Sequence, residues 1–194
     1  MIEIELKDIC KNYDGRPVLS SMTAVFDPGS CTLLTGRSGI GKTTLLNMII
    51  GLVRPDSGSI RISPNPTGFG VVFQEDRLLE SFTAAHNIAI IKPSPAFDII
   101  EKDLKRLIPD LNPKASVAEL SGGMRRRVAI ARAVLSRSDV LIMDEPFTGL
   151  DAKAREAAIA YIMEKRNGRT LIIASHDLSG LEGFEILEVP EIDE

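Results

Sequence analysis

Residues 36 to 43 read Gly-Arg-Ser-Gly-Ile-Gly-Lys-Thr, directly after an apolar run at 31–35 and at the start of a segment, 42–51, with helical apolar spacing. This spacing of glycine, lysine and threonine between a strand and a helix is that of a P-loop. The glycines allow the backbone to curl so that several N–H groups point at phosphate oxygens, and the helix adds the positive end of its dipole. We therefore predict a site for the phosphates of a nucleotide, formed by Gly36, Arg37, Ser38, Gly39, Ile40, Gly41, Lys42, Thr43 and Thr44.

Two side chains of this loop and two acids further along the chain have separate expected roles. Lys42 is expected to reach the β- and γ-phosphates, and the Thr43 hydroxyl to bind Mg²⁺. Residues 140–145, Val-Leu-Ile-Met-Asp-Glu, are an apolar strand that ends in two carboxylates. Asp144 can hold Mg²⁺ through a water molecule, and Glu145 can then polarise an attacking water as general base. The alternative is two solvated loop acids, which the P-loop upstream disfavours.

Strands and helices alternate along most of the chain, which predicts an α/β fold with a mainly parallel sheet covered on both faces. The strand at 2–6 is expected at a sheet edge, and the other expected strands are 18–26, 31–35, 59–62, 69–73, 140–143, 171–174 and 184–189. The expected helices are 42–51, 82–91, a segment near 97–108, one opened by 121–123 and one that carries 154–162. Prolines at 93 and 95 are expected to break the second of these helices. The block from 76 to 135 is therefore a candidate helical subdomain.

Composition and charge exclude several classes of protein. The 194 residues are 44% hydrophobic and 26% charged, an ordinary balance for a globular domain. A net charge of −4 argues against a nucleic-acid surface, and the run Arg125–Arg127 is expected to be a solvated helix face. The sequence has neither a signal peptide nor an apolar stretch of the roughly 18 residues that a membrane span needs. We therefore expect a soluble chain whose membrane role, if it has one, depends on a partner.

A third motif, Leu120-Ser121-Gly122-Gly123-Met124, brings the sequence to a known family. Together with the P-loop and the acidic strand end, it resembles the ATP-binding subunits of ABC transporters, whose signature is Leu-Ser-Gly-Gly-Gln. Ser121, Gly122 and Gly123 open a helix, and a simple N-cap is the alternative interpretation. A second anion-binding helix start is redundant for the same phosphate but serves a purpose for ATP held by another copy. The resemblance implies such a head-to-tail dimer, and Met124 in place of glutamine is not expected to change it.

The resemblance also implies roles for four further residues. Gln74, after an apolar strand, resembles the glutamine that contacts Mg²⁺ or the water, and His176 resembles the switch histidine near the γ-phosphate. Asp151 resembles the aspartate at the dimer seam, although the family more often has Ser-Ala before the Leu-Asp where this chain has Thr148-Gly149. Tyr13 resembles the aromatic residue that stacks on adenine, and a packed turn tyrosine is the alternative.

The resemblance implies a P-loop NTPase fold with an N-terminal antiparallel β part and an inserted helical subdomain. We expect one ABC ATPase domain over 1–194, with a RecA-like core and β subdomain at 1–75 and 136–194 and the helical subdomain at 76–135. The chain is expected to hydrolyse ATP to ADP and phosphate with Mg²⁺ and to power transport. Its expected partners are a second copy or a paralogous ATPase, an integral membrane permease and, for an importer, a substrate-binding protein; no nucleic acid is expected. Its expected location is peripheral, on the cytoplasmic side of the cell membrane.

Two stretches, 72–79 and 120–125, look most like the nitrate, sulfonate and taurine importer branch, so import is the expected direction. An exporter motor and a soluble ABC ATPase acting on a macromolecule are the alternatives. A P-loop kinase or GTPase has no use for the motif at 120–124. Because the sequence ends soon after His176, no C-terminal regulatory domain is expected.

Overall fold

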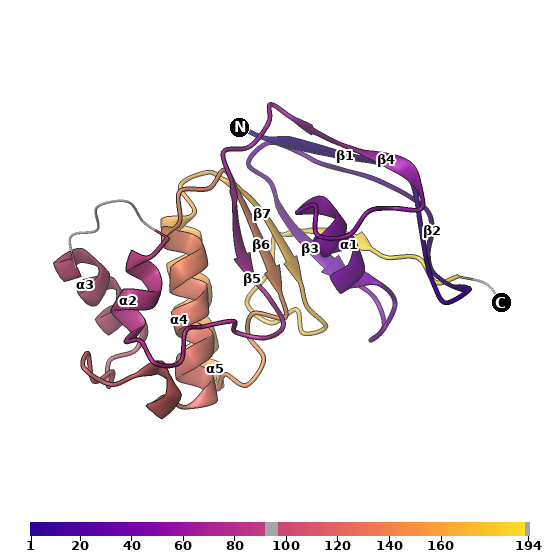
Figure 1. The fold of residues 1–194 in the computed structure, drawn as a ribbon. Coiled ribbons are helices and arrows are strands. Elements are labelled where there is room, and N and C mark those ends of the chain that lie inside the picture. The colour runs from indigo at the N-terminus through magenta and orange to yellow at the C-terminus, as the bar shows by residue number, and fades with distance from the viewer. Residues whose placement is uncertain (92–96, 193–194) are drawn as a thin grey trace.

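In the computed structural model, which describes residues 1–91 and 97–192, two sheets and a group of helices lie side by side (Figure 1). The larger sheet is parallel, with strand order β5-β6-β7-β3-β8, and the smaller is antiparallel, with order β2-β1-β4. The strands of the larger sheet are β3 (Cys31–Thr35), β5 (Phe69–Val72), β6 (Val140–Asp144), β7 (Thr170–Ala174) and β8 (Glu185–Glu188). The α/β fold with a mainly parallel sheet, predicted from the alternating pattern, is confirmed.

The parallel sheet separates two hydrophobic cores. Every residue of β6 and β7 is buried, as expected for strands covered on both faces. Leu141 and Met143 face the core formed with α4 (Gly122–Leu135) and α5 (Ala152–Lys165). Val140 and Ile142 face the core formed with α1 (Lys42–Ile49) and the small sheet. Figure 1 shows α1 between the two sheets. Because β3, β6 and β7 run parallel, the residues that follow them all leave the sheet at the carboxyl end of its strands.

The antiparallel sheet places its first strand in the middle. β1 (Glu3–Tyr13) pairs with β2 (Arg16–Phe26) on one side and with β4 (Ser57–Ser63) on the other. The prediction that residues 2–6 form an edge strand is therefore wrong. Alternation of apolar and acidic residues indicates that one face of the strand is buried, as Ile4 and Leu6 are. It does not indicate whether the strand pairs with one neighbouring strand or with two.

The helices between β5 and β6 form a layer beyond the parallel sheet. They are α2 (Ala84–Ala89), α3 (Phe97–Leu107), a 3-10 turn at Val117–Glu119 and α4 (Gly122–Leu135). Ile88, Ile100 and Leu104 are buried in the same core as Val128 of α4. The expected helix at 82–91 is shorter, because Thr83 caps it by accepting a hydrogen bond from His86 N. The helix-breaking prolines, 93 and 95, lie outside the described residues.

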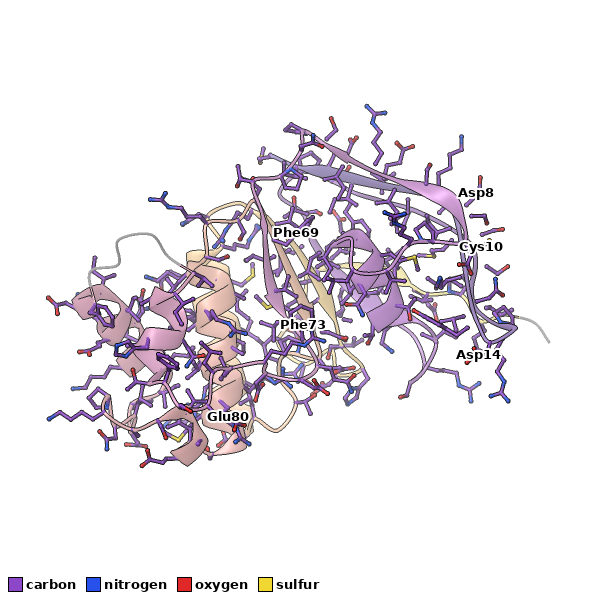
Figure 2. All side chains as sticks on the ribbon, in the orientation of Figure 1. Asp8, Cys10, Asp14, Phe69, Phe73 and Glu80 are labelled. Atoms are coloured by element: carbon purple, nitrogen blue, oxygen red, sulfur yellow. The ribbon has the colours of Figure 1, made fainter. Side chains whose placement is uncertain are left out.

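The junction between this layer and the sheet is at the end of β5. Figure 2 shows Phe69 at the start of β5, Phe73 just past its end, and Glu80 further along the chain beside the helices. Among the residues that the structure describes, no helix is long and apolar enough to cross a membrane.

The close contact of β5 with α4 can be tested at Gly70. A Cβ atom there would lie 2.4 Å from the Ala133 carbonyl oxygen and 2.7 Å from Leu141 Cδ2. Gly70→Ala is therefore expected to lower the free energy of unfolding by about 1–3 kcal/mol, measured by urea denaturation. The matched control is Gly68→Ala, whose added Cβ would meet only the Arg137 carbonyl oxygen at 3.4 Å. Equal urea midpoints for the two variants would contradict this packing.

Candidate nucleotide-binding site

A cavity of about 390 Å³ opens where the P-loop and the ends of the parallel strands meet. This volume lies in the usual range for small-molecule sites. The cavity brings together segments that are far apart in the sequence, and its lining residues are Val18, Ser38, Gly39, Gly41, Lys42, Thr43, Thr44, Gln74, Asp144, Glu145 and His176. Ten of these eleven were predicted from the sequence as site residues; Val18 was not.

The P-loop backbone leaves helix α1 open to an anion. Gly41 caps the helix with a positive φ of 112°, and a Cβ there would lie 2.9 Å from the Val18 carbonyl oxygen, so that only glycine fits. The helix has no side-chain N-cap hydrogen bond and no acidic residue in its first turn. Its first N–H groups therefore have no side chain of the described chain to satisfy them and suit a phosphate.

Lys42 is a buried cation with neutral partners. Its side chain folds back over the loop, and Nζ donates to the carbonyl oxygens of Gly36 at 2.7 Å and Arg37 at 3.0 Å. An ammonium group has three N–H donors, and a buried charge is costly without an opposite charge. The third donor is left for a ligand, and the charge has no salt-bridge partner among the described residues, so both fit the anionic phosphates of a nucleotide.

Thr43 and Asp144 form a pair of oxygen donors on the other side of the loop. The Thr43 hydroxyl donates to Asp144 Oδ2 at 2.6 Å, although the two residues come from α1 and β6. Burial raises the pKa of the Asp144 carboxyl above its ordinary value, and the hydrogen bond from Thr43 partly opposes that rise. The described residues contain no cluster of three or more His, Cys, Asp or Glu side chains suited to a metal ion. Mg²⁺ usually takes one or two protein oxygens together with waters and substrate phosphates, and the Thr43–Asp144 pair supplies oxygens of this kind.

Glu145 and His176 face each other across the ends of β6 and β7. His176 Nδ1 lies 3.1 Å from both carboxylate oxygens of Glu145. Glu145 has a positive φ of 47°, which is uncommon outside glycine, and its N–H donates to the Ala174 carbonyl at 2.8 Å. The carboxylate is mostly buried, with 20% of its side chain exposed, whereas 74% of the His176 side chain is exposed. The sharp backbone turn thus directs Glu145 into the cavity next to Asp144.

Arg126 fixes the loop that carries Gln74. Its guanidinium donates to the carbonyl oxygens of Phe73 and Gln74, and Nε lies 3.3 Å from Asp76 Oδ1. Arg132, two turns further along α4, donates to the carbonyl oxygens of Asp76 and Arg77 in the same loop. Helix α4, which begins at the Leu120–Met124 motif, is therefore bonded directly to the loop that carries Gln74.

The prediction that Arg125–Arg127 form a solvated helix face is wrong for two of the three residues. Arg126 is buried, and Arg127 donates to the carbonyl oxygens of Gly123 and Leu107. Charge alone does not show that loop carbonyls face the helix, so sequence reasoning missed Arg126. The available signal was its spacing of four residues from Ile130, which places both on the buried side of α4.

The remaining predicted site residues do not line this cavity. Ser121 caps α4 by accepting from Met124 N at 3.3 Å, and Asp151 caps α5 by accepting from Ala154 N at 2.8 Å. Gly123 approaches the Gly149 carbonyl so closely that a Cβ would lie 3.2 Å from it, which brings the two motifs together. Tyr13 ends β1 with 44% exposure. The other residues outside the lining are Gly36, Arg37, Ile40 and Gly122.

The P-loop at the end of a parallel sheet, with two acids following the strand β6, defines a P-loop ATPase domain. A family model described as ABC transporter matches residues 19–148, and the chain belongs to that family. It is 34% identical to "Nod factor export ATP-binding protein I" of Burkholderia thailandensis and 33% identical to the protein of that name from Rhizobium etli. These alignments cover 92% and 94% of this chain, which spans 64% and 63% of the two relatives.

Solved structures share the fold along nearly the whole chain. "Dimeric structure of a post-hydrolysis state of the ATP-binding cassette MJ0796 bound to ADP and Pi" superposes with a TM-score of 0.83 at 26% identity, over 98% of this chain and 97% of that one. A bacterial Atm1-family ABC exporter with ATP bound has a TM-score of 0.83 at 24% identity, over 97% of this chain and 37% of that one. The P-loop NTPase fold of an ABC ATPase, predicted from the motifs, is confirmed.

The relatives do not support the importer branch suggested by residues 72–79 and 120–125. The curated relatives reported above are named for export. Both stretches contain residues expected to handle nucleotide, Gln74 in the first and Ser121 in the second, so their sequence follows the chemistry that the family shares and says little about the direction of transport.

The raised pKa of Asp144 gives a stability prediction. The folded chain holds this proton more tightly than the unfolded chain, so the charged carboxylate costs stability at pH values above the raised pKa, and the cost disappears at low pH. Asp144→Asn is therefore expected to raise the free energy of unfolding at pH 7 by about 0.5–2 kcal/mol, measured by urea denaturation with EDTA and without nucleotide.

The matched control for this prediction has the opposite sign. Hydrogen bonds from the Thr67 N–H and hydroxyl lower the pKa of Asp139, so its charged form stabilises the fold above the ordinary pKa and that stability is lost as the pH falls. Asp139→Asn is expected to lower the urea midpoint at pH 7. A midpoint lowered equally by both substitutions would contradict the environment described for Asp144.

Proposed function

We propose that this chain binds Mg-ATP at residues 36–44 and hydrolyses it between two copies, and that this powers a separate membrane subunit. The observation that carries the proposal is the buried Lys42 ammonium, whose partners are two carbonyl oxygens, at the base of a cavity that also holds Glu145 and His176. A cation in that setting binds anions, and a carboxylate beside it serves as a base. The family match supports ATP as the ligand.

The chain's own residues divide the reaction between binding and proton transfer. Lys42 and the N–H groups at the start of α1 hold the phosphates and offset the charge that develops on the γ-phosphoryl group. Bound Mg²⁺, held by Thr43 and Asp144 with Gln74 nearby, would supply further positive charge to the phosphate oxygens. Glu145 takes the proton of the attacking water, and His176 orients that carboxylate through Nδ1.

The second half of the site comes, in this proposal, from another copy of the chain. Ser121 and Gly122 are exposed at the start of α4 and lie outside the lining of the chain's own cavity. A helix start placed there can cap a phosphate only if that phosphate belongs to a neighbouring molecule. Asp151, exposed at the start of α5 beside this motif, is then at the seam. Tyr13, exposed at the end of β1, is proposed to stack on the adenine of the bound ATP. A paralogous ATPase is the other partner that would complete the site.

The membrane partner is proposed to bind the segment 74–91. This segment exposes large apolar side chains at Leu79, Phe82 and Ile90, which are 47%, 47% and 61% exposed. It follows directly after Gln74, so a partner that binds there contacts the loop that reaches the cavity. In this proposal the chain is a peripheral subunit on the cytoplasmic side of the membrane. We propose export as the direction, because the relatives are named for export, and a substrate-binding protein then has no role.

Glu145→Gln tests the base. The substitution is expected to reduce ATP hydrolysis by roughly 10²–10⁴-fold, the usual contribution of a general base, while ATP still binds. It is also expected to accumulate an ATP-bound dimer in gel filtration. Glu101→Gln, on an exposed position of α3, is the control and is expected to hydrolyse ATP at the wild-type rate. Normal turnover by Glu145→Gln would remove the base from the mechanism.

Mixing two inactive variants tests whether the site is shared. Lys42→Ala is expected to weaken nucleotide binding, and Ser121→Arg is expected to block the phosphate cap without changing the P-loop. A mixed dimer pairs one intact P-loop with one intact signature, so mixing is expected to restore about one working site per mixed dimer. The measurement is ATPase activity against mixing ratio, with each variant alone as control. An activity that never exceeds that of the separate variants would mean that each chain completes its own site.

A further inference from the structure

The Arg155 guanidinium connects the first turn of α5 to the loop that follows β7. Nε donates to the Ser179 carbonyl at 3.0 Å, Nη1 to Asp177 Oδ2 at 2.7 Å and Nη2 to the Asp177 carbonyl at 2.9 Å. Only 13% of the Arg155 side chain is exposed, and its two bonds to Asp177 are partly buried. A planar guanidinium that makes three such bonds holds its partners in one orientation.

The loop that Arg155 holds contains His176. Asp177, the next residue, also accepts from the N–H and the hydroxyl of Ser179, and these bonds lower the pKa of its carboxyl. On the other side of the histidine, the Ser175 hydroxyl donates to the Asp177 carbonyl at 3.0 Å. The two residues that flank His176, Ser175 and Asp177, are therefore bonded to each other through the Asp177 carbonyl, which Arg155 also binds.

The same guanidinium also contacts the loop that carries Glu145. Its central carbon lies 4.9 Å from the centre of the Phe147 ring, within the range of a cation–π interaction. Phe147 is buried, and the turn that contains it is closed by hydrogen bonds from Thr148 N to the Glu145 carbonyl and from Leu150 N to the Phe147 carbonyl. One cation thus contacts both loops whose side chains meet at the 3.1 Å contact of His176 with Glu145.

We propose that Arg155 is a positioning residue, which sets the separation and orientation of Glu145 and His176 without contacting the nucleotide. This inference rests on the proposed function, because it assigns Arg155 to the pair that handles the attacking water. Arg155 N donates to the Asp151 carbonyl in the first turn of α5, so a displacement of the helix start moves the guanidinium and both loops with it. The alignment of the base therefore follows the position of the start of α5.

Loss of Arg155 is expected to slow ATP turnover without weakening nucleotide binding. Arg155 does not line the cavity that contains Lys42 and Thr43, so its loss leaves nucleotide binding intact. Without the Arg155 bonds, Glu145 and His176 are expected to shift relative to each other. A displacement of about 1 Å at reacting groups costs on the order of 10²-fold in rate. A purely structural role would instead lower stability without changing the turnover of the folded protein.

The experiment compares Arg155→Met with Arg166→Met in the full chain. Arg166, at the other end of α5, donates to the carbonyl oxygens of Gly29 and Arg169 and is far from the cavity lining, so it controls for the loss of a structural arginine. Both variants are assayed for ATP binding, kcat and KM at a temperature where denaturation curves show that they are folded. Arg155→Met is expected to lower kcat by on the order of 10–100-fold with KM unchanged, and Arg166→Met to keep the wild-type kcat.

Two further variants decide how Arg155 acts. In a His176→Ala background, Arg155→Met is expected to cost little more, because both substitutions disable the same pair. Arg155→Lys, which can bond Asp177 Oδ2 but cannot make all three bonds, is expected to have a kcat between those of Arg155→Met and the wild type. An additive loss in the His176→Ala background, or a wild-type kcat in Arg155→Met, overturns the proposal. Failure of the proposed function is distinct, since it appears as normal turnover by Glu145→Gln.

Discussion

The rest of the site is arranged around the buried ammonium of Lys42, which makes no salt bridge with any residue that the structure describes. Lys42 Nζ is held by two carbonyl oxygens of the loop from which it projects, which fixes its position without neutralising it. The glycine turn contributes to this arrangement, because Gly36, whose carbonyl is one of the two acceptors, has a positive φ of 133° that glycine adopts without strain. Asp144 and Glu145, at the end of β6, line the same cavity as Lys42. The cavity therefore offers an ammonium group for phosphates and carboxylates for a cation, which is the combination that the proposed Mg-ATP requires.

Arginines hold the loops that surround this charge, and they do so mainly through carbonyl oxygens. Arg126 and Arg132 bind the loop after β5, and Arg155 binds the loop after β7. Parallel strands end at a fixed edge, but the loops beyond that edge have few backbone partners of their own. A guanidinium supplies several donors in one plane and so gives an irregular loop a definite shape. The sheet therefore determines where the side chains emerge, and the arginines determine how they are directed.

Much of the fold and of the cavity was predictable because their signals are local. The P-loop is contiguous, and the runs at β3, β6 and β7 are mostly apolar because most of their residues are buried on both faces of the sheet. The parts that were not predictable depend on residues distant in sequence. Pairing on both sides of β1, the burial of Arg126 against loop carbonyls and the contact of Val18 with the P-loop all arise only after the chain has folded. The exposed Tyr13 stays a prediction, because its expected partner is a ligand.

The left-handed backbone at Glu145 has a consequence for any attempt to improve this protein by thermostability alone. A residue with a Cβ held at positive φ costs about 1–2 kcal/mol relative to glycine, and asparagine adopts that conformation more readily than glutamate does. A library screened only for survival at high temperature would thus enrich Gly or Asn at this position, and it would recover well-folded clones with no carboxylate beside the phosphate loop. If Glu145 is the base of the proposed function, resistance to heat and turnover number are opposed at this one residue, and the two have to be selected together.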